Sequence, residues 1–182
     1  MDAELPARLA VDLPGGFDAL VRSFQHRIFA FALGLSGDPA DAEEVAQDAF
    51  LRAYRALLTY DAERIRGLAL SAWLHRIALN VFRNRVRRRM LRVMPLDGEL
   101  KIADRRAGPE EQALRSAALL ELASLVAGLP ELQRAAVVLR CVQDLPYAEV
   151  AQVLGQPKGT VKSNVHRGLA ALRARLALSE VS

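Results

Sequence analysis

The side chains best suited to binding chemistry lie near the C-terminus, in the segment KGTVKSNVHRG at residues 158–168. Lysine is rare in this chain, yet two of its three lysines, Lys158 and Lys162, occur here. Basic side chains hold phosphates, and arginine can bind guanine through two hydrogen bonds in the DNA major groove. We therefore predict phosphate contacts from the two lysines and a guanine contact from Arg167, although a solvated helix surface would explain any one of these charges. The predicted DNA-binding set is Lys158, Thr160, Lys162, Ser163, Asn164, His166 and Arg167.

Catalytic and metal-binding chemistry is not indicated by the sequence. The three histidines, His26, His75 and His166, fall in separate predicted helices without cysteine or glutamate at metal-ligand spacing. Cys141 is the only cysteine, lies in the apolar run VVLRCV and is expected in the core. No glycine-rich segment resembles a phosphate-binding loop. We therefore expect no enzyme activity, no bound metal and no cofactor.

A helix–turn–helix is the element predicted to position the C-terminal basic residues. Gly155 can adopt the left-handed conformation that ends a helix, and Pro157 blocks the continuation of that helix. The second helix is predicted over about 160–176, with Thr160 as its cap or in its first turn. Its apolar residues recur with the helical period and form the stripe Val161, Val165, Leu169, Leu172 and Leu176.

The rest of the chain also has helical rather than strand periodicity. Asp38 followed by proline is typical of a helix start, and residues 59–67 indicate a polar loop. Residues 93–112 lose the helical period and collect prolines and glycines, which indicates a linker. The predicted helices cover about 17–34, 38–57, 71–91, 113–127, 130–139, 146–154 and 160–176.

Length and composition agree with an all-α fold of two small helical domains joined by a flexible linker. The chain has 182 residues, of which 52% are hydrophobic and 25% charged, as in globular proteins. The predicted boundaries are an N-terminal tail at 1–16, domains at 17–92 and 113–182, and the linker at 93–112. No apolar run reaches the ~20 residues of a membrane helix, and no signal pattern opens the chain, so we expect a cytoplasmic protein.

Charge is segregated along the chain, although the net charge is only +4. Residues 28–51 contain acidic but no basic side chains, whereas residues 76–92 contain arginines and no acidic residue. Residues 150–179 are again basic and free of acidic side chains. One acidic and two basic segments suggest two kinds of partner.

Three segments resemble conserved regions two and four of bacterial sigma factors: DAEEVAQDAFLRAYRAL at 41–57, AWLHRIALNVFRNRVRRR at 72–89 and GTVKSNVHRGLAALR at 159–173. The chain length and short linker resemble the extracytoplasmic-function (ECF) group of this family. The resemblance covers about 17–92 and 113–178. It implies a promoter-specificity subunit that binds core RNA polymerase and promoter DNA, both duplex and melted, and by analogy an anti-sigma factor.

The resemblance also implies roles for individual segments. The acidic helix would bind core polymerase, the arginine-rich helix would melt and read the minus-ten element, and the C-terminal helix would read the minus-thirty-five element. The loop at 60–70 would help to capture unstacked bases, while Trp73 is expected in the core. The core-polymerase set is Asp41, Glu43, Glu44, Gln47, Asp48 and Phe50. The minus-ten set is Arg76, Asn80, Arg83, Asn84, Arg87 and Arg88.

Two positions depart from the pattern of the family. Asn164 stands where the family commonly has arginine, and Gly168 stands where alanine is usual. Glycine inside a helix is expected to cost roughly 0.5–1 kcal/mol relative to alanine. Both departures bear on how the C-terminal helix reads DNA rather than on the class of protein.

Two other classes of protein are compatible with the residues taken alone. A dimeric helix–turn–helix regulator would bind operators without polymerase, and it would need a dimerisation face. A recombinase would need a nucleophile beside clustered arginines, but Ser23, Ser36 and Ser71 are scattered along the N-terminal half.

Overall fold

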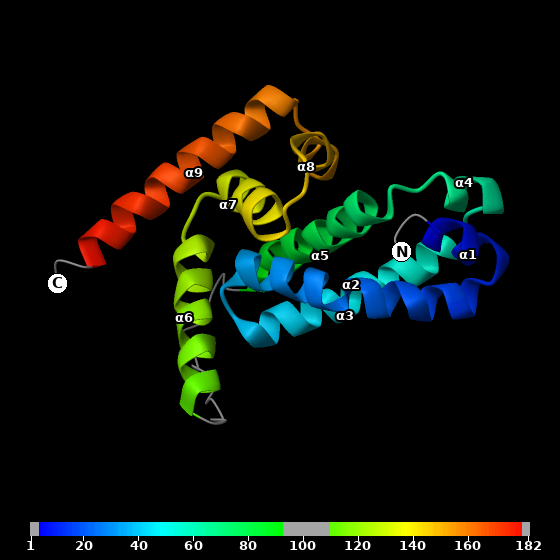
Figure 1. Cartoon of the computed structure of the whole chain (residues 1–182), viewed down its shortest axis with the longest axis horizontal. Helices are drawn as coiled ribbons and strands as arrows, with labels where there is room; N and C mark the ends of the chain where they lie inside the picture. The colour runs from blue at the N-terminus through cyan, green and yellow to red at the C-terminus, as the bar shows by residue number, and fades with distance from the viewer. Residues whose placement is uncertain (1–3, 93–109, 180–182) are drawn as a thin grey trace.

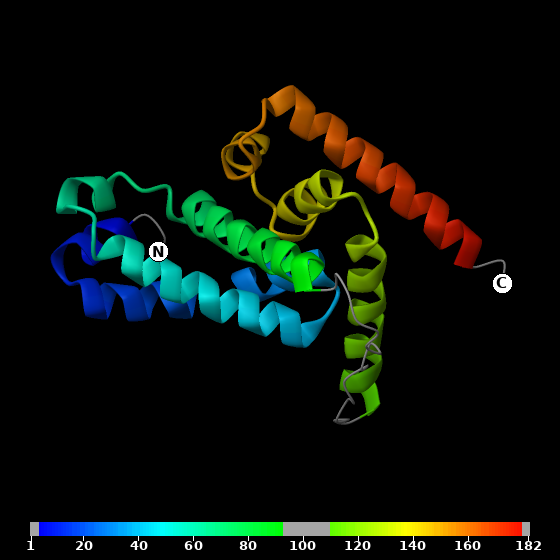
Figure 2. The ribbon, with the colours of Figure 1, turned by 180° about the vertical axis from the view of Figure 1, so that it is seen from behind.

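The computed structural model describes residues 4–92 and 110–179, and every regular element within these ranges is a helix. Helices α1 to α5 form one group; α7 and α8 lie against it, α6 lies across the end of α2, and α9 packs on α7 and α8 (Figures 1 and 2). The predicted all-α class is confirmed. The predicted linker falls mostly on 93–109, outside the described residues, and its last three residues already belong to a helix.

Three long helices form the body of the N-terminal half: α2 (Leu13–Ser36), α3 (Pro39–Leu57) and α5 (Leu70–Arg92). The turn between α2 and α3 is formed by the residue types that favour a helix end and a helix start. Gly37 ends α2 in the left-handed conformation, with a φ of 71°, where a side chain would be strained. Asp38 then caps α3, because its Oδ1 accepts a hydrogen bond from the Asp41 amide at 2.8 Å, as predicted.

The N-terminal residues predicted as a tail contain a packed helix, α1 (Leu5–Val11). Leu5 and Leu9 are buried, and Gly16 allows the close approach of α1 to α2, since a β-carbon at Gly16 would lie 2.8 Å from the α-carbon of Leu9. A second short helix, α4 (Ala62–Arg66), lies within the predicted polar loop and is capped by Asp61. Short helices of this kind depend on tertiary packing, so periodicity over a few residues does not reveal them.

The C-terminal half contains α6 (Glu110–Ala127), α7 (Glu131–Val137), the π-helical turn η1 (Val138–Val142), α8 (Tyr147–Leu154) and α9 (Lys158–Ser179). The predicted helix at 130–139 is therefore α7 continuing into a π-helical turn. Thr160 lies in the first turn of α9, as expected.

The two halves share one continuous hydrophobic core, in which residues of α2 and α5 pack with residues of α7, η1 and α8. Two glycines of the N-terminal half permit this close contact. A β-carbon at Gly34 would lie 2.8 Å from Cγ2 of Val138, and one at Gly37 would lie 2.8 Å from Cβ of Ala127. The two halves therefore pack closely against each other at the C-terminal end of α2.

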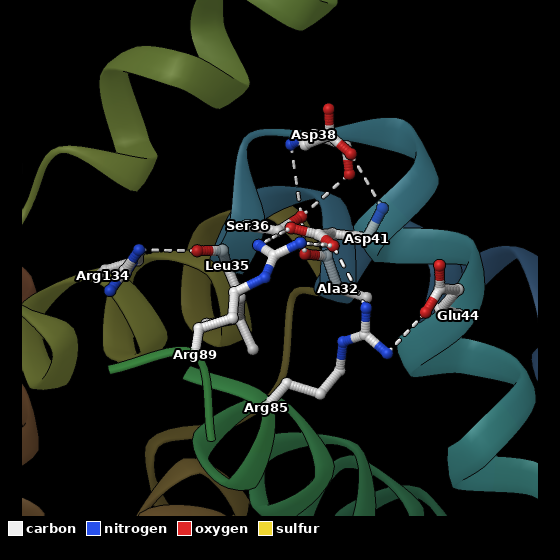
Figure 3. Close-up of polar contacts among 9 residues, drawn as sticks. All are labelled: Ala32, Leu35, Ser36, Asp38, Asp41, Glu44, Arg85, Arg89 and Arg134. Atoms are coloured by element: carbon white, nitrogen blue, oxygen red, sulfur yellow. Dashed lines mark hydrogen bonds and ion pairs between the residues drawn. The ribbon is translucent and has the colours of Figure 1, made fainter. Parts of the chain in front are cut away.

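Arg134 of α7 adds a polar joint between the halves. Its Nη1 donates hydrogen bonds to the carbonyl oxygens of Leu35, at 2.6 Å, and Ala127, at 2.9 Å. Figure 3 shows the first of these bonds reaching from α7 to the end of α2. Its guanidinium also lies 5.4 Å from the centre of the Phe82 ring. Because the carbonyl ends of helices are partly negative, one arginine stabilises the ends of α2 and α6 together.

Candidate nucleic-acid interface

Helices α8 and α9 form the predicted helix–turn–helix. Gly155 follows α8 in the left-handed conformation, with a φ of 63°, and its amide donates to the carbonyl of Ala151. The inner face of the pair is apolar, as the sequence pattern predicts. Its buried residues are Val150, Val153, Leu154, Val161, Val165 and Leu172.

The outward face of α9 brings most of the predicted DNA-binding residues together. The exposed members of the set are Lys158, Thr160, Lys162, Ser163, His166 and Arg167. The last four of these line a surface hollow of about 520 Å³. A continuous polar and basic surface of this kind on the second helix of a helix–turn–helix is suited to the major groove.

Asn164 differs from the rest of the predicted set because it is buried, with 6% of its surface exposed. Its Nδ2 donates to Oε1 of Gln156 at 3.1 Å, across the turn between the two helices. Its Oδ1 accepts a hydrogen bond from Nη2 of Arg167 at 3.5 Å. Asn164 therefore points into the helix pair, unlike the other members of the predicted DNA-binding set.

Gly168 also has a different role from the expected one. A β-carbon at this position would lie 2.6 Å from Cγ2 of Val137 and 3.4 Å from the carbonyl oxygen of Gln133. Glycine therefore lets α9 approach α7 closely. The expected gain from alanine considered only helix propensity and omitted this contact.

Helix α5 carries the predicted minus-ten set, but not all of that set is available on its surface. Arg76, Asn80, Arg87 and Arg88 are exposed. Arg83 instead forms an ion pair with Glu131 of α7, at 2.7 Å. Asn84 is half-buried and accepts a hydrogen bond from Arg87 at 2.8 Å. The C-terminal half thus occupies one of the arginines that the sequence assigns to DNA.

The acidic helix α3 is joined to α5 by a cluster of ion pairs (Figure 3). Arg89 binds both carboxylate oxygens of Asp41, at 2.6 and 2.8 Å, and Arg85 lies 3.2 Å from the same carboxylate. Arg85 also pairs with Glu44 at 2.6 Å. Burial lowers the pKa of Arg85, but its bonds to these two carboxylates outweigh burial and raise it. Asp41 therefore has a structural role.

The remaining residues of the predicted polymerase set differ in exposure. Glu43 and Gln47 are exposed and hydrogen-bonded to each other at 3.2 Å. The side chain of Glu44 is 60% exposed despite its ion pair. Asp48 is half-buried, and Phe50 is half-buried against the core. Three polar side chains on two successive turns of α3 are thus exposed.

The structure contains two clusters of aromatic and basic side chains that the sequence did not predict. The Arg64 guanidinium lies 3.7 Å from the centre of the Tyr60 ring, and Trp73, half-buried against the core, lies 6.3 Å from that ring. In the other cluster, Arg140 and Lys162 both lie near the Tyr147 ring. Local spacing gives no signal for these contacts, because their members come from different elements.

Nothing in the described residues forms a metal site, as no group of three or more histidine, cysteine or acidic side chains lies close enough together.

His75 is fully buried, and its Nδ1 lies 2.7 Å from the Ser71 carbonyl oxygen. Burial lowers the pKa of His75 to about 4, despite that hydrogen bond.

Cys141 is exposed, contrary to its predicted place in the core. Within the part of the chain that the structure describes, no helix has the length and apolar character to cross a membrane.

Comparison with known proteins places both halves in one family. Residues 20–92 match Sigma-70 region 2, and residues 119–172 match Sigma-70 region 4. The ECF RNA polymerase sigma factor SigE of Mycolicibacterium smegmatis is 36% identical, over 88% of this chain and 62% of its own length, so the chain spans less than two thirds of that relative. SigM of Mycobacterium tuberculosis H37Rv is 37% identical, over 97% of this chain and 83% of its own.

A solved structure agrees with these relatives. CnrH, in complex with the cytosolic domain of CnrY, superposes with a TM-score of 0.72 and 26% identity, covering 97% of both chains. The chain belongs to the ECF sigma factors of RNA polymerase. Membership in this family agrees with the sigma-factor resemblance and not with the operator-binding regulator or the recombinase.

Proposed function

We propose that this chain binds core RNA polymerase through α3 and reads two promoter elements, the minus-ten element with α5 and the minus-thirty-five element with α9. The observation that carries this proposal is the exposed polar and basic face of α9 on a helix–turn–helix. It is supported by the arginines on the exposed part of α5. We assign these roles to the predicted domains at 17–92 and 113–182, with 93–112 as their connection.

The polymerase-facing surface is proposed to consist of Glu43, Glu44 and Gln47, with Asp41, Asp48 and Phe50 supporting it from within. Exposed carboxylates on one helix suit a basic partner surface, because opposite charges raise the association rate and fix the orientation. Asp41 contributes by holding α5 against α3.

Promoter contacts are proposed to fall in two groups. Lys158, Lys162 and the arginines of α5 bind phosphates of the duplex and of the melted strand, whereas Arg167 reads a base edge. Use of Arg83 by the minus-ten element requires that Glu131 release it first. Binding of DNA by Arg83 is therefore proposed to follow the opening of this ion pair between α5 and α7.

The proposed setting is the bacterial cytoplasm, where core polymerase and promoter DNA are found. An anti-sigma factor, which the family resemblance implies, is a further proposed partner; in support, the similar protein CnrH forms a complex with the cytosolic domain of a second protein, CnrY. No small-molecule cofactor is required by these roles.

The test is transcription from a library of genomic promoters by core polymerase, with and without the purified chain. We expect new start sites that share two spaced upstream motifs. Arg167→Ala should lose the upstream motif, whereas Arg173→Ala, an exposed arginine on the same helix, should keep it. Glu44→Lys should abolish all new starts, whereas Glu121→Lys, an exposed acid on α6, should not. Starts that do not depend on the added chain would refute the proposal.

A further inference from the structure

Three polar side chains form a chain of hydrogen bonds from the turn of the helix–turn–helix to its outer face. Gln156 lies in the turn, Asn164 is buried in α9, and Arg167 is exposed one turn later on the same helix. The bond from Asn164 to Gln156 is 3.1 Å, and the bond from Arg167 to Asn164 is 3.5 Å. The buried amide thus connects the turn with the residue proposed to read a base.

The chemistry of the three side chains determines which atom donates and which accepts in each hydrogen bond. A guanidinium can only donate hydrogen bonds, so Asn164 must present its oxygen to Arg167. Its Nδ2 then points to Gln156, which must present its own oxygen. Because a buried amide is costly to leave unpaired, Gln156 holds Asn164 in the one orientation that accepts from Arg167.

The contacts of Arg167 hold its guanidinium near its own helix. Besides the bond to Asn164, its Nε donates to the carbonyl oxygen of Ser163 at 3.4 Å. Arginine has five donor hydrogens in a planar group, so these two bonds leave others for a ligand while restricting the side-chain rotamer. If these residues served only to stabilise the turn, the bond between Gln156 and Asn164 would be enough, and the bond to Arg167 would not be needed.

We propose that Gln156 and Asn164 are positioning residues that set the rotamer of Arg167 and thereby the base preference at the minus-thirty-five element. This inference rests on the proposed function of α9. Neither positioning residue touches DNA in this role. Their effect on base preference passes entirely through Arg167.

The experiment measures transcription by the holoenzyme on a promoter panel in which each base pair of the minus-thirty-five element is varied. Gln156→Ala should reduce the preference for the best base several-fold, and Arg167→Ala should reduce it roughly tenfold or more. The double variant should match Arg167→Ala alone, because the effect of Gln156 requires the arginine. Gln152→Ala, an exposed glutamine on α8, is the matched control and should leave the preference unchanged.

The possible outcomes separate this inference from the function it rests on. If Arg167→Ala changes the base preference but Gln156→Ala behaves like the control, the positioning role is refuted and base reading by α9 stands. If Gln156→Ala weakens every promoter equally, and does so again in the Arg167→Ala background, the role is structural only and the inference is also refuted. If Arg167→Ala leaves the preference intact, the proposed reading by α9 itself fails.

A second variant keeps the test valid if the alanine variants unfold. Asn164→Asp retains an oxygen for Arg167, while Gln156 can rotate its amide and donate to the new carboxylate. Asn164→Asp should therefore preserve the base preference, whereas Asn164→Leu should reduce it as far as Gln156→Ala does. Equal preferences for these two variants would contradict the inference.

Discussion

Gly168 shows how one tertiary contact can reverse an effect expected from helix propensity. Alanine should be favoured by up to about 1 kcal/mol inside a helix, but its β-carbon would lie 2.6 Å from the stiff, β-branched side chain of Val137. We expect Gly168→Ala to lower the free energy of unfolding by about 1–3 kcal/mol, as overpacking does. Urea denaturation measures this change.

Gly159 provides the control for that substitution, because it lies in the first turn of the same helix and, apart from its own helical backbone, nothing lies within 4 Å of an added β-carbon. Gly159→Ala should leave stability unchanged or raise it by up to about 1 kcal/mol. If both alanine variants were stabilising, α9 would not approach α7 as closely as described.

His75 makes the stability of the protein depend on pH. Its pKa is lowered to about 4 in the folded chain, so between pH 6.5 and 4 the unfolded chain binds a proton that the folded chain does not. The neutral imidazole of His75 contributes fully to the free energy of unfolding above pH 6.5, and this contribution is lost as the pH falls. Between pH 7 and pH 5 the loss should be about 2 kcal/mol.

Urea denaturation of the wild type and of His75→Leu at pH 7, 6 and 5 tests this dependence. The difference in unfolding free energy between the two proteins should change across the series, because leucine does not titrate. His166→Gln, which removes an exposed imidazole, is the matched control. A constant offset between wild type and His75→Leu would contradict the lowered pKa of His75.

At the scale of elements, α5 is held against α3 by charge as well as by apolar packing. Asp41 accepts from Arg85 and Arg89, and its side chain is only 18% exposed. We expect Asp41→Asn to cost about 1 kcal/mol and to increase hydrogen exchange in the last turns of α5. The loss should shrink at high salt, because salt screens the partly exposed Arg89.

Glu43→Gln is the control for this element, since the hydrogen bond of Glu43 is to Gln47 within α3. It should leave exchange in α5 unchanged, although it removes the same charge from the same helix. Equal protection of α5 in both variants would show that the ion pairs do not hold the helix.

At the scale of the whole molecule, the two halves form a closed unit in which an arginine assigned to promoter DNA is already paired. Arg134 binds the ends of α2 and α6, and Gly34 admits the side chain of Val138. We expect the double variant Gly34→Ala, Arg134→Ala to separate the halves, because it removes both the polar joint and the space for contact. Small-angle scattering should then show a larger radius of gyration.

Arg140→Ala is the matched control, because Arg140 lies in the same half but pairs with Asp144 four residues along its own segment. Its radius of gyration should equal that of the wild type. The opened double variant should also bind minus-ten single-stranded DNA more tightly, since Arg83 is freed from Glu131. An unchanged radius would mean that the shared apolar core alone closes the molecule.

The sequence by itself determined the longer helices and the turn that presents the basic face. Asp38, Gly155 and Pro157 act within a few residues of their own positions, so capping and periodicity identify them without knowledge of the fold. The exposure of Lys162 and Arg167 follows from the same helical period, because their apolar neighbours define the opposite face. The family resemblance rests on the segments 41–57, 72–89 and 159–173, and the comparisons confirm it.

Only the tertiary structure decided which of those polar residues are available. Arg134 and Leu35 are separated by 99 positions in the chain, and Arg83 and Glu131 by 48. No local pattern encodes such pairs, because they depend on how whole helices pack. The burial of Asn164 and the close contact at Gly168 have the same cause, since each is set by an element outside α9. Local signals thus identified the helices that are proposed to read DNA, and packing determined which of their side chains are exposed.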